Sequence, residues 1–326
     1  ASDTTLPYAN AYFTIYLTGT VFALMSTGMN QFIICQGFAK TGMYSVIIGA
    51  VLNIVLDPVF IFGFHMGVSG AATATVLSQT ASCAFVLKTL FGKTVPVRIT
   101  FGGYDWRLIR RILTIGFTPF IIIAMDNVMI ITMNAILQKY GGAARGDLLI
   151  TCATIAQSFM LVVTMPLGGI TSGTQAVLAY NFGAGNTDRV KGAQKYIFIL
   201  AAAYTTLLFI LARTVGGLFV RLFTSDPTVA AEALRAIRIF TLAIIPLAFQ
   251  YEIVDGFTGL GQVQVALPLS FFRKGLYFVS LFLLPAMFGA EAAFFAEPVS
   301  DIAGPVVSAI VYIVSMKGIL AKAGKN

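Results

Sequence analysis

The chain has 326 residues, of which 58% are hydrophobic and only 10% are charged. No soluble domain of this size has such a composition, which is instead typical of a protein that crosses a membrane several times. The net charge of +8 suggests nucleic acid as a partner. We reject nucleic-acid binding, because the basic residues gather in the loops expected on one side of the membrane.

Apolar segments follow one another along the chain and predict nine membrane-spanning helices. No strand-like alternation is present, so an outer-membrane barrel is excluded and the predicted fold is an all-α polytopic membrane protein. The fifth segment is too long for one straight span and is expected to end at the membrane interface. The nine segments are residues 11–37, 41–64, 67–91, 110–138, 147–179, 193–220, 231–260, 266–288 and 290–316.

The second segment contains the most informative residue of the chain, Asp57. A carboxylate inside a bilayer is costly and usually has a functional reason to be there. Asn53 lies four residues earlier, so both side chains share one face of the helix. Pro58 has no N–H to donate to the carbonyl of Ile54. Together these groups predict a site for a proton or a cation.

Two pairs of polar residues lie in later segments. Asp126 and Asn127 are adjacent on the fourth segment, and Glu252 and Asp255 are three residues apart on the seventh, where they can share a face. Glu252 and Asp255 are neighbouring carboxylates, which favours proton binding, and Asp126 is a further acid within a span. Both pairs are therefore candidates for a second proton or substrate site. The single histidine, His65, excludes a multi-histidine metal site.

The distribution of Lys and Arg predicts the orientation of the chain. Most of the 21 basic residues fall in loops of one sense, with Arg273 and Lys274 counted among them. This places the carboxyl terminus in the cytoplasm, and nine spans then place Ala1 outside the cell. The first residues contain neither an initiator methionine nor a signal peptide. We therefore expect that the chain lacks its natural beginning.

A short internal repeat suggests two homologous halves. At a constant offset of 222 residues, Gly67 pairs with Gly289, and small residues recur at matching positions after each of them. The repeat predicts a complete six-span lobe at the carboxyl end and the last three spans of another lobe before it. The missing part would then measure roughly 100 residues. The expected divisions are 1–92 for the partial lobe, 93–109 for a cytoplasmic loop between lobes, and 110–326 for the complete lobe with its tail.

Two long stretches resemble the multidrug and toxic-compound extrusion (MATE) transporters, in particular their bacterial branch. One stretch runs from Asn30 to Gln79 and includes Leu-Asn-Ile-Val-Leu-Asp-Pro. The other runs from Met165 to Arg189 and includes Met-Pro-Leu-Gly-Gly-Ile-Thr-Ser-Gly-Thr-Gln. The resemblance implies a two-lobe bundle of twelve helices, of which nine are present here. It also implies export of organic cations through a cleft that opens alternately to either side.

Some of these relatives have a cation site in the amino-terminal lobe, and the resemblance carries part of it over to this chain. Asn53 and Asp57 match an Asn-x-x-x-Asp pair, and Thr75 matches a threonine on the next helix. An aspartate on the first helix of the family has no counterpart in this sequence. The resemblance thus implies a site for a proton or sodium ion at Asn53, Asp57 and Thr75. We expect no other metal ion to bind than sodium at Asp57.

The functional expectation is a secondary antiporter that exports cationic drugs in exchange for sodium ions or protons. We expect a monomer in a bacterial plasma membrane, whose partners are the lipid bilayer and amphiphilic cationic small molecules, with no cofactor. The alternatives are a flippase for lipid-linked precursors, an inactive truncated transporter and a membrane-embedded enzyme. A flippase should have several cations in its cavity, whereas the spans are nearly free of Lys and Arg, with Arg213 the main exception. No catalytic motif supports an enzyme.

Overall fold

The computed structural model describes residues 6–93 and 95–323, and every regular element in these ranges is helical. The expected all-α fold is confirmed. The chain divides into two compact units, Ala1–Tyr104 and Asp105–Asn326, each with its own packing. The division lies within the segment expected to connect two lobes.

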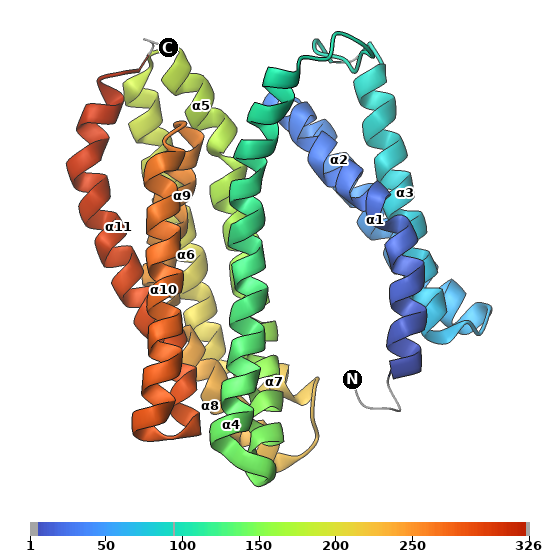
Figure 1. Ribbon diagram of the computed structural model, residues 1–326. Helices are drawn as coiled ribbons and strands as arrows, with labels where there is room; N and C mark the ends of the chain where they lie inside the picture. Colours follow the sequence, from blue (N-terminus) through green and yellow to red (C-terminus); the bar gives the residue numbers. More distant parts are fainter. Residues whose placement is uncertain (1–5, 94, 324–326) are drawn as a thin grey trace. The chain divides into compact units, whose positions relative to one another are not determined.

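The amino-terminal unit contains three long helices, drawn in blue and cyan in Figure 1. They are α1 (Leu6–Cys35), α2 (Ala39–Pro58), which continues into the π-helix η1 (Val59–Gly63), and α3 (Gly67–Phe91). The α3 helix packs against both α1 and α2. The α2 and α3 backbones come close because Gly49 faces Ser82, whose hydroxyl donates to the Ser45 carbonyl over 2.8 Å. Small residues thus hold α2 and α3 together, as is usual in membrane bundles.

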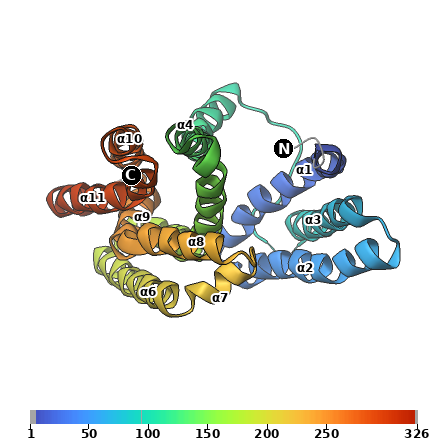
Figure 2. The same cartoon turned by 90° about the horizontal axis from the view of Figure 1, so that it is seen from below.

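The carboxyl-terminal unit is a bundle of longer and shorter helices (Figures 1 and 2). In chain order they are α4 (Trp106–Gly173), α5 (Gln175–Gly183), α6 (Thr187–Thr214), α7 (Gly216–Arg221), α8 (Pro227–Phe240), η2 (Thr241–Ala243), α9 (Ile244–Gly259), α10 (Val263–Phe288), η3 (Ala290–Phe295) and α11 (Ala296–Leu320). Gly142, with φ 64° and ψ −174°, divides α4 into two helical halves. A side chain is disfavoured at this φ, so glycine permits the turn between two spans.

Local chemistry explains where some of these helices begin. The Asp226 carboxylate accepts hydrogen bonds from the backbone N–H groups of Thr228 (2.7 Å) and Val229 (3.3 Å), and Pro227 occupies the first turn of α8. An N-cap aspartate followed by proline is a strong helix start, because it satisfies N–H groups that have no partner within the helix. The helix then buries Ala236, Ile237 and Phe240 in the main core of the unit, against the second half of α4 and η3.

Eight helical segments of the described residues are long and apolar enough to cross a membrane, judged by length and composition. They correspond to the last eight of the nine expected spans. The first expected span forms the 30-residue helix α1, which is not among these eight segments. The long fifth segment is interrupted at Thr174, between α4 and α5.

One expectation about the loops is wrong. Arg273 and Lys274 do not lie in a loop but near the middle of α10, one of the candidate spans. Both are paired with carboxylates of neighbouring helices, and the pairing offsets the cost of placing charge in an apolar span. They therefore do not contribute to the loop charges from which the orientation was predicted.

The proposed repeat has a geometric counterpart in the backbone. Gly67 (φ 55°) and Gly289 (φ 88°) both occupy the left-handed region at the start of the next helical element. Glycine recurs at this repeat position because other residues are strained there.

Candidate functional site

In the amino-terminal unit, the structure brings the three predicted site residues together. The Asn53 amide, on α2, donates to the Asp57 carboxylate over 3.2 Å and to the Thr75 hydroxyl over 3.4 Å. The hydroxyl in turn donates to the backbone carbonyl of Ala71 (2.9 Å) on α3. All three side chains are half-buried. Asn53 and Asp57 meet because they lie one turn apart, and Thr75 joins them because α3 packs against α2.

The helix that carries Asp57 changes its hydrogen-bonding pattern immediately after the site. Pro58 ends α2, and residues Val59–Gly63 form a π-helix, with the Phe64 N–H donating to the Val59 carbonyl over 2.9 Å. Proline cannot donate to the carbonyl four residues earlier, and π-turns are frequent where helices carry functional groups. The carboxylate thus stands beside a carbonyl that has lost its α-helical donor.

The carboxyl-terminal unit contains a cavity of about 500 Å³, within the usual size of a small-molecule pocket. Its walls are largely apolar, with a few polar and charged groups facing inward. The lining residues are Gly116, Ile122, Asp126, Gln175, Gln250, Tyr251, Val254, Asp255, Thr258, Val263, Ala266, Leu267, Ser270, Arg273 and Lys274. An apolar wall with a few charged groups suits an amphiphilic ligand.

Asp126 and Lys274 form an ion pair at this cavity. The Lys274 ammonium group is buried, with 3% of the side chain exposed, and it donates to the Asp126 carboxylate and to the Ile122 carbonyl (2.7 Å). The Asp126 side chain is 52% exposed. Asn127 does not line the cavity, and its amide donates to the Ile123 carbonyl of its own helix over 3.1 Å. Of the two adjacent residues, only Asp126 therefore belongs to the cavity.

Asp255 also lines the cavity, where neutral donors hold it. The Thr171 hydroxyl and the Gln175 amide donate to its two oxygens, over 2.5 and 3.0 Å. Thr171 lies in the last turn of α4 and Gln175 begins α5, so both donors lie next to the interruption at Thr174 and reach Asp255 of α9.

Glu252 lies one turn before Asp255 but is fully buried, with 0% of the residue exposed. Neither of its carboxylate oxygens accepts a hydrogen bond from the described residues. The side-chain nitrogen of Gln194 and a carboxylate oxygen of Glu252 both face the α-carbon of Gly256, and this nitrogen also has no hydrogen-bond partner among the described residues. The side-chain oxygen of Gln194 accepts a hydrogen bond from the Tyr312 hydroxyl over 3.1 Å. A buried, unpartnered negative charge is very costly, which favours binding of a proton or a cation at Glu252.

The structure adds a buried ion pair that sequence reasoning missed. Arg273 donates to the Asp301 carboxylate over 2.8 Å, with 13% and 0% of the two side chains exposed. Glu297, one turn before Asp301 on α11, interacts electrostatically with Arg273 and Lys274. The sequence contains a signal for this site, because Glu297 and Asp301 are acids within an expected span and their spacing places them on one helix face.

Comparisons with known proteins agree with this fold. The MatE family model matches residues 1–59 and 123–283. Over 293 residues the chain is 25% identical to the multidrug export protein MepA of Staphylococcus haemolyticus (strain JCSC1435), and equally so to that of Staphylococcus aureus (strain MSSA476). These matches cover 89% of this chain but 63% of each relative, so the chain spans less than two thirds of their length.

Solved structures show the same architecture. One is described as the outward-facing conformation of a multidrug resistance MATE family transporter; its TM-score is 0.87 at 20% identity, over 98% of this chain and 72% of that one. Another is a transporter of the MOP superfamily from Pyrococcus furiosus, described as having a binding pocket of reverse polarity. Its TM-score is 0.85 at 21% identity, over 95% of this chain and 70% of that one. At these identities the likeness shows the fold alone.

Proposed function

The chain belongs to the MatE family, and on that premise we propose that it acts as a secondary antiporter in a bacterial plasma membrane. It exports amphiphilic organic cations in exchange for sodium ions or protons, as a monomer and without an enzymatic step. The observation that carries the proposal is the meeting of Asn53, Asp57 and Thr75 within two packed helices.

The coupling ion binds at Asp57. Carboxylate, amide and hydroxyl oxygens are the ligands that sodium-like hard cations prefer. The Asn53 amide turns its oxygen toward the ion when sodium is bound, since either end of an amide fits the same position. Binding neutralises Asp57, changes the packing of α2 around Pro58 and favours one of two states of the transporter. Exchange requires that the ion and the drug favour different states.

The cavity of the carboxyl-terminal unit receives the organic cation. Its apolar wall contacts the body of the molecule, and the half-exposed Asp126 attracts the charge. Glu252 and Asp255 serve as a second proton site, in which Asp255 faces the cavity and Glu252 lies behind it. Their carboxylates interact electrostatically, so a proton on one affects the other.

A flippase for anionic lipid-linked precursors is the second candidate, because Arg273 and Lys274 both line the cavity. The expectation that span interiors are nearly free of such cations is wrong. However, each cation is paired with a carboxylate, Asp301 or Asp126, and Asp255 adds a further acid. The charges around the cavity therefore favour a cationic ligand over an anionic one.

The orientation follows from the remaining basic residues. Without Arg273 and Lys274, most Lys and Arg still lie on one side, in loops or at the helix ends next to them, as Arg189, Lys191 and Lys195 do at the start of α6. We place these loops and the carboxyl terminus in the cytoplasm.

The test is Asp57→Asn in the full-length transporter, reconstituted in liposomes with a sodium or proton gradient. We expect loss of gradient-driven export of tetraphenylphosphonium, because asparagine cannot change its charge when an ion binds. Asp188→Asn, at an exposed position on α6, is the matched control and should export normally. Normal gradient-driven export by the Asp57→Asn protein would overturn the proposed coupling site.

A further inference from the structure

We infer that the ammonium group of Lys274 is a tethered competitor of the transported cation: it occupies Asp126 in the unloaded cavity and must be displaced by the substrate. This inference rests on the proposed function and adds to it the residue that selects among cations. It follows from the burial and the partners of the Asp126–Lys274 pair.

The two partners are unequally exposed. Lys274 is almost fully buried in α10, whereas about half of the Asp126 side chain is exposed at the cavity. An entering cation therefore meets the carboxylate before it meets the lysine. Asp301 is held by Arg273, and Asp255, whose partners Thr171 and Gln175 are neutral, belongs to the proposed proton site. Asp126 is therefore the carboxylate of the cavity at which an organic cation can replace a protein cation.

Lys274 retains partners when it releases Asp126. Its ammonium group donates to the Ile122 carbonyl over 2.7 Å, and it interacts electrostatically with Glu297 of α11. A buried lysine without partners is very costly, but a lysine that keeps a carbonyl and a nearby carboxylate pays much less for the exchange.

The competition has a consequence for selectivity. A small hydrated cation gains only the ion pair with Asp126, and Lys274 already provides that pair from within the protein. An amphiphilic cation gains contact with the apolar wall as well, so it can displace the lysine. Lys274 thus favours amphiphilic cations over small inorganic ones.

The experiment measures equilibrium binding of tetraphenylphosphonium to the full-length protein in lipid nanodiscs. For Lys274→Met we expect binding about ten-fold tighter, because Asp126 is no longer occupied most of the time and an occupied site lowers apparent affinity in proportion. The double variant Asp126→Asn/Lys274→Met should lose this gain. Binding of uncharged triphenylphosphine oxide should be the same in the wild type and in Lys274→Met.

Lys317→Met, at an exposed position near the end of α11, is the matched control and should bind as the wild type does. Thermal unfolding identifies any variant that is misfolded, and Lys274→Gln then replaces Lys274→Met. Unchanged or weaker binding by the folded variant, with normal binding by the wild type, overturns the inference and leaves the proposed function standing. If the wild-type protein neither binds tetraphenylphosphonium nor exports it along a gradient, both the inference and the proposed function are overturned.

Discussion

At the scale of single residues, the buried side chain of Arg273 depends on a small neighbour for its space. Arg273 reaches Asp301 across the contact between α10 and α11. It can do so because residue 304 is a glycine: a Cβ atom there would lie 2.9 Å from the Arg273 Cγ and 3.0 Å from its Cβ. The absence of one side chain thus makes room for a buried ion pair.

We expect Gly304→Ala to destabilise the protein by about 1–3 kcal/mol, because the added methyl group overpacks the contact with Arg273. Gly318→Ala on the same helix is the control, since a Cβ atom there meets nothing within 4 Å. That change should stabilise α11 by about 0.5–1 kcal/mol, because alanine loses less entropy in a helix than glycine. Thermal unfolding in detergent measures both, and equal shifts for the two variants would contradict the packing argument.

At the scale of helices, the end of α2 is the element most closely tied to the proposed coupling site. Asp57, Pro58 and the π-helix Val59–Gly63 follow one another without a break. In the proposed function, this part of the helix, with its irregular hydrogen bonding, is the one that repacks when Asp57 gains or loses the coupling ion.

Replacing Pro58 should separate stability from transport. Pro58→Ala restores an N–H donor for the Ile54 carbonyl, so we expect a gain in stability of up to about 3 kcal/mol and slower ion-driven export. Pro227→Ala is the control, because Pro227 lies in the first turn of α8, where the N–H has no helical partner. The measurements are thermal unfolding and export rate in liposomes; a Pro58→Ala protein with wild-type values for both would argue against a hinge.

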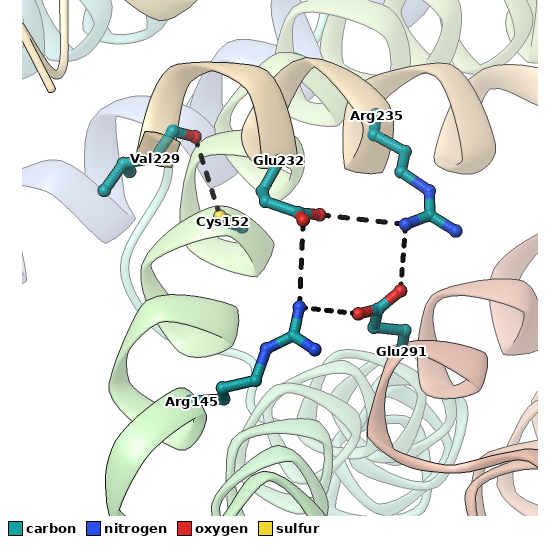
Figure 3. Close-up of polar contacts among 6 residues, drawn as sticks. All are labelled: Arg145, Cys152, Val229, Glu232, Arg235 and Glu291. Carbon is teal, nitrogen blue, oxygen red and sulfur yellow. Dashed lines mark hydrogen bonds and ion pairs between the residues drawn. The ribbon is translucent and has the colours of Figure 1, made fainter. Parts of the chain in front are cut away.

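At the scale of the whole molecule, an ion-pair network joins parts of the carboxyl-terminal unit that are distant in the sequence (Figure 3). Glu291 of η3 pairs with Arg145 of α4 at 2.7 Å and with Arg235 of α8 at 2.9 Å. Glu232 contacts the same two arginines at 3.7 and 3.9 Å. These four side chains link α4, α8 and η3 to one another.

Glu291→Gln should therefore destabilise the unit by about 1 kcal/mol, the upper range for partly exposed ion pairs. Glu232→Gln is the matched control and should cost less than half as much, because its contacts are longer. The difference between the variants should shrink in about 1 M NaCl, where the screening length is about 3 Å. Thermal unfolding at low and high salt tests this, and an effect of Glu291→Gln that is independent of salt would point to a cause other than charge.

Local patterns were sufficient for much of this protein. Long apolar runs predicted the spans, because the cost of exposing backbone polar groups to lipid leaves helices as the solution. The i, i+4 spacing placed Asn53 and Asp57 on one face of α2, and the resemblance added Thr75. These features depend on neighbours in the chain or on motifs, so they could be predicted without knowing how the helices pack.

Only the tertiary structure decided which charges meet. Lys274 and Asp126 are 148 residues apart, and Arg273 contacts Asp301 on another helix. Linear counting grouped both basic residues with the loops although the expected span 266–288 contains them, because the sequence does not show which carboxylates pair with charges inside a span. Likewise, Glu252 and Asp255 share a helix, but the Asp255 carboxylate accepts two hydrogen bonds whereas the buried Glu252 carboxylate accepts none from the described residues. Spacing determines which face a side chain occupies, whereas its partners and its exposure to water depend on the helices packed against that face.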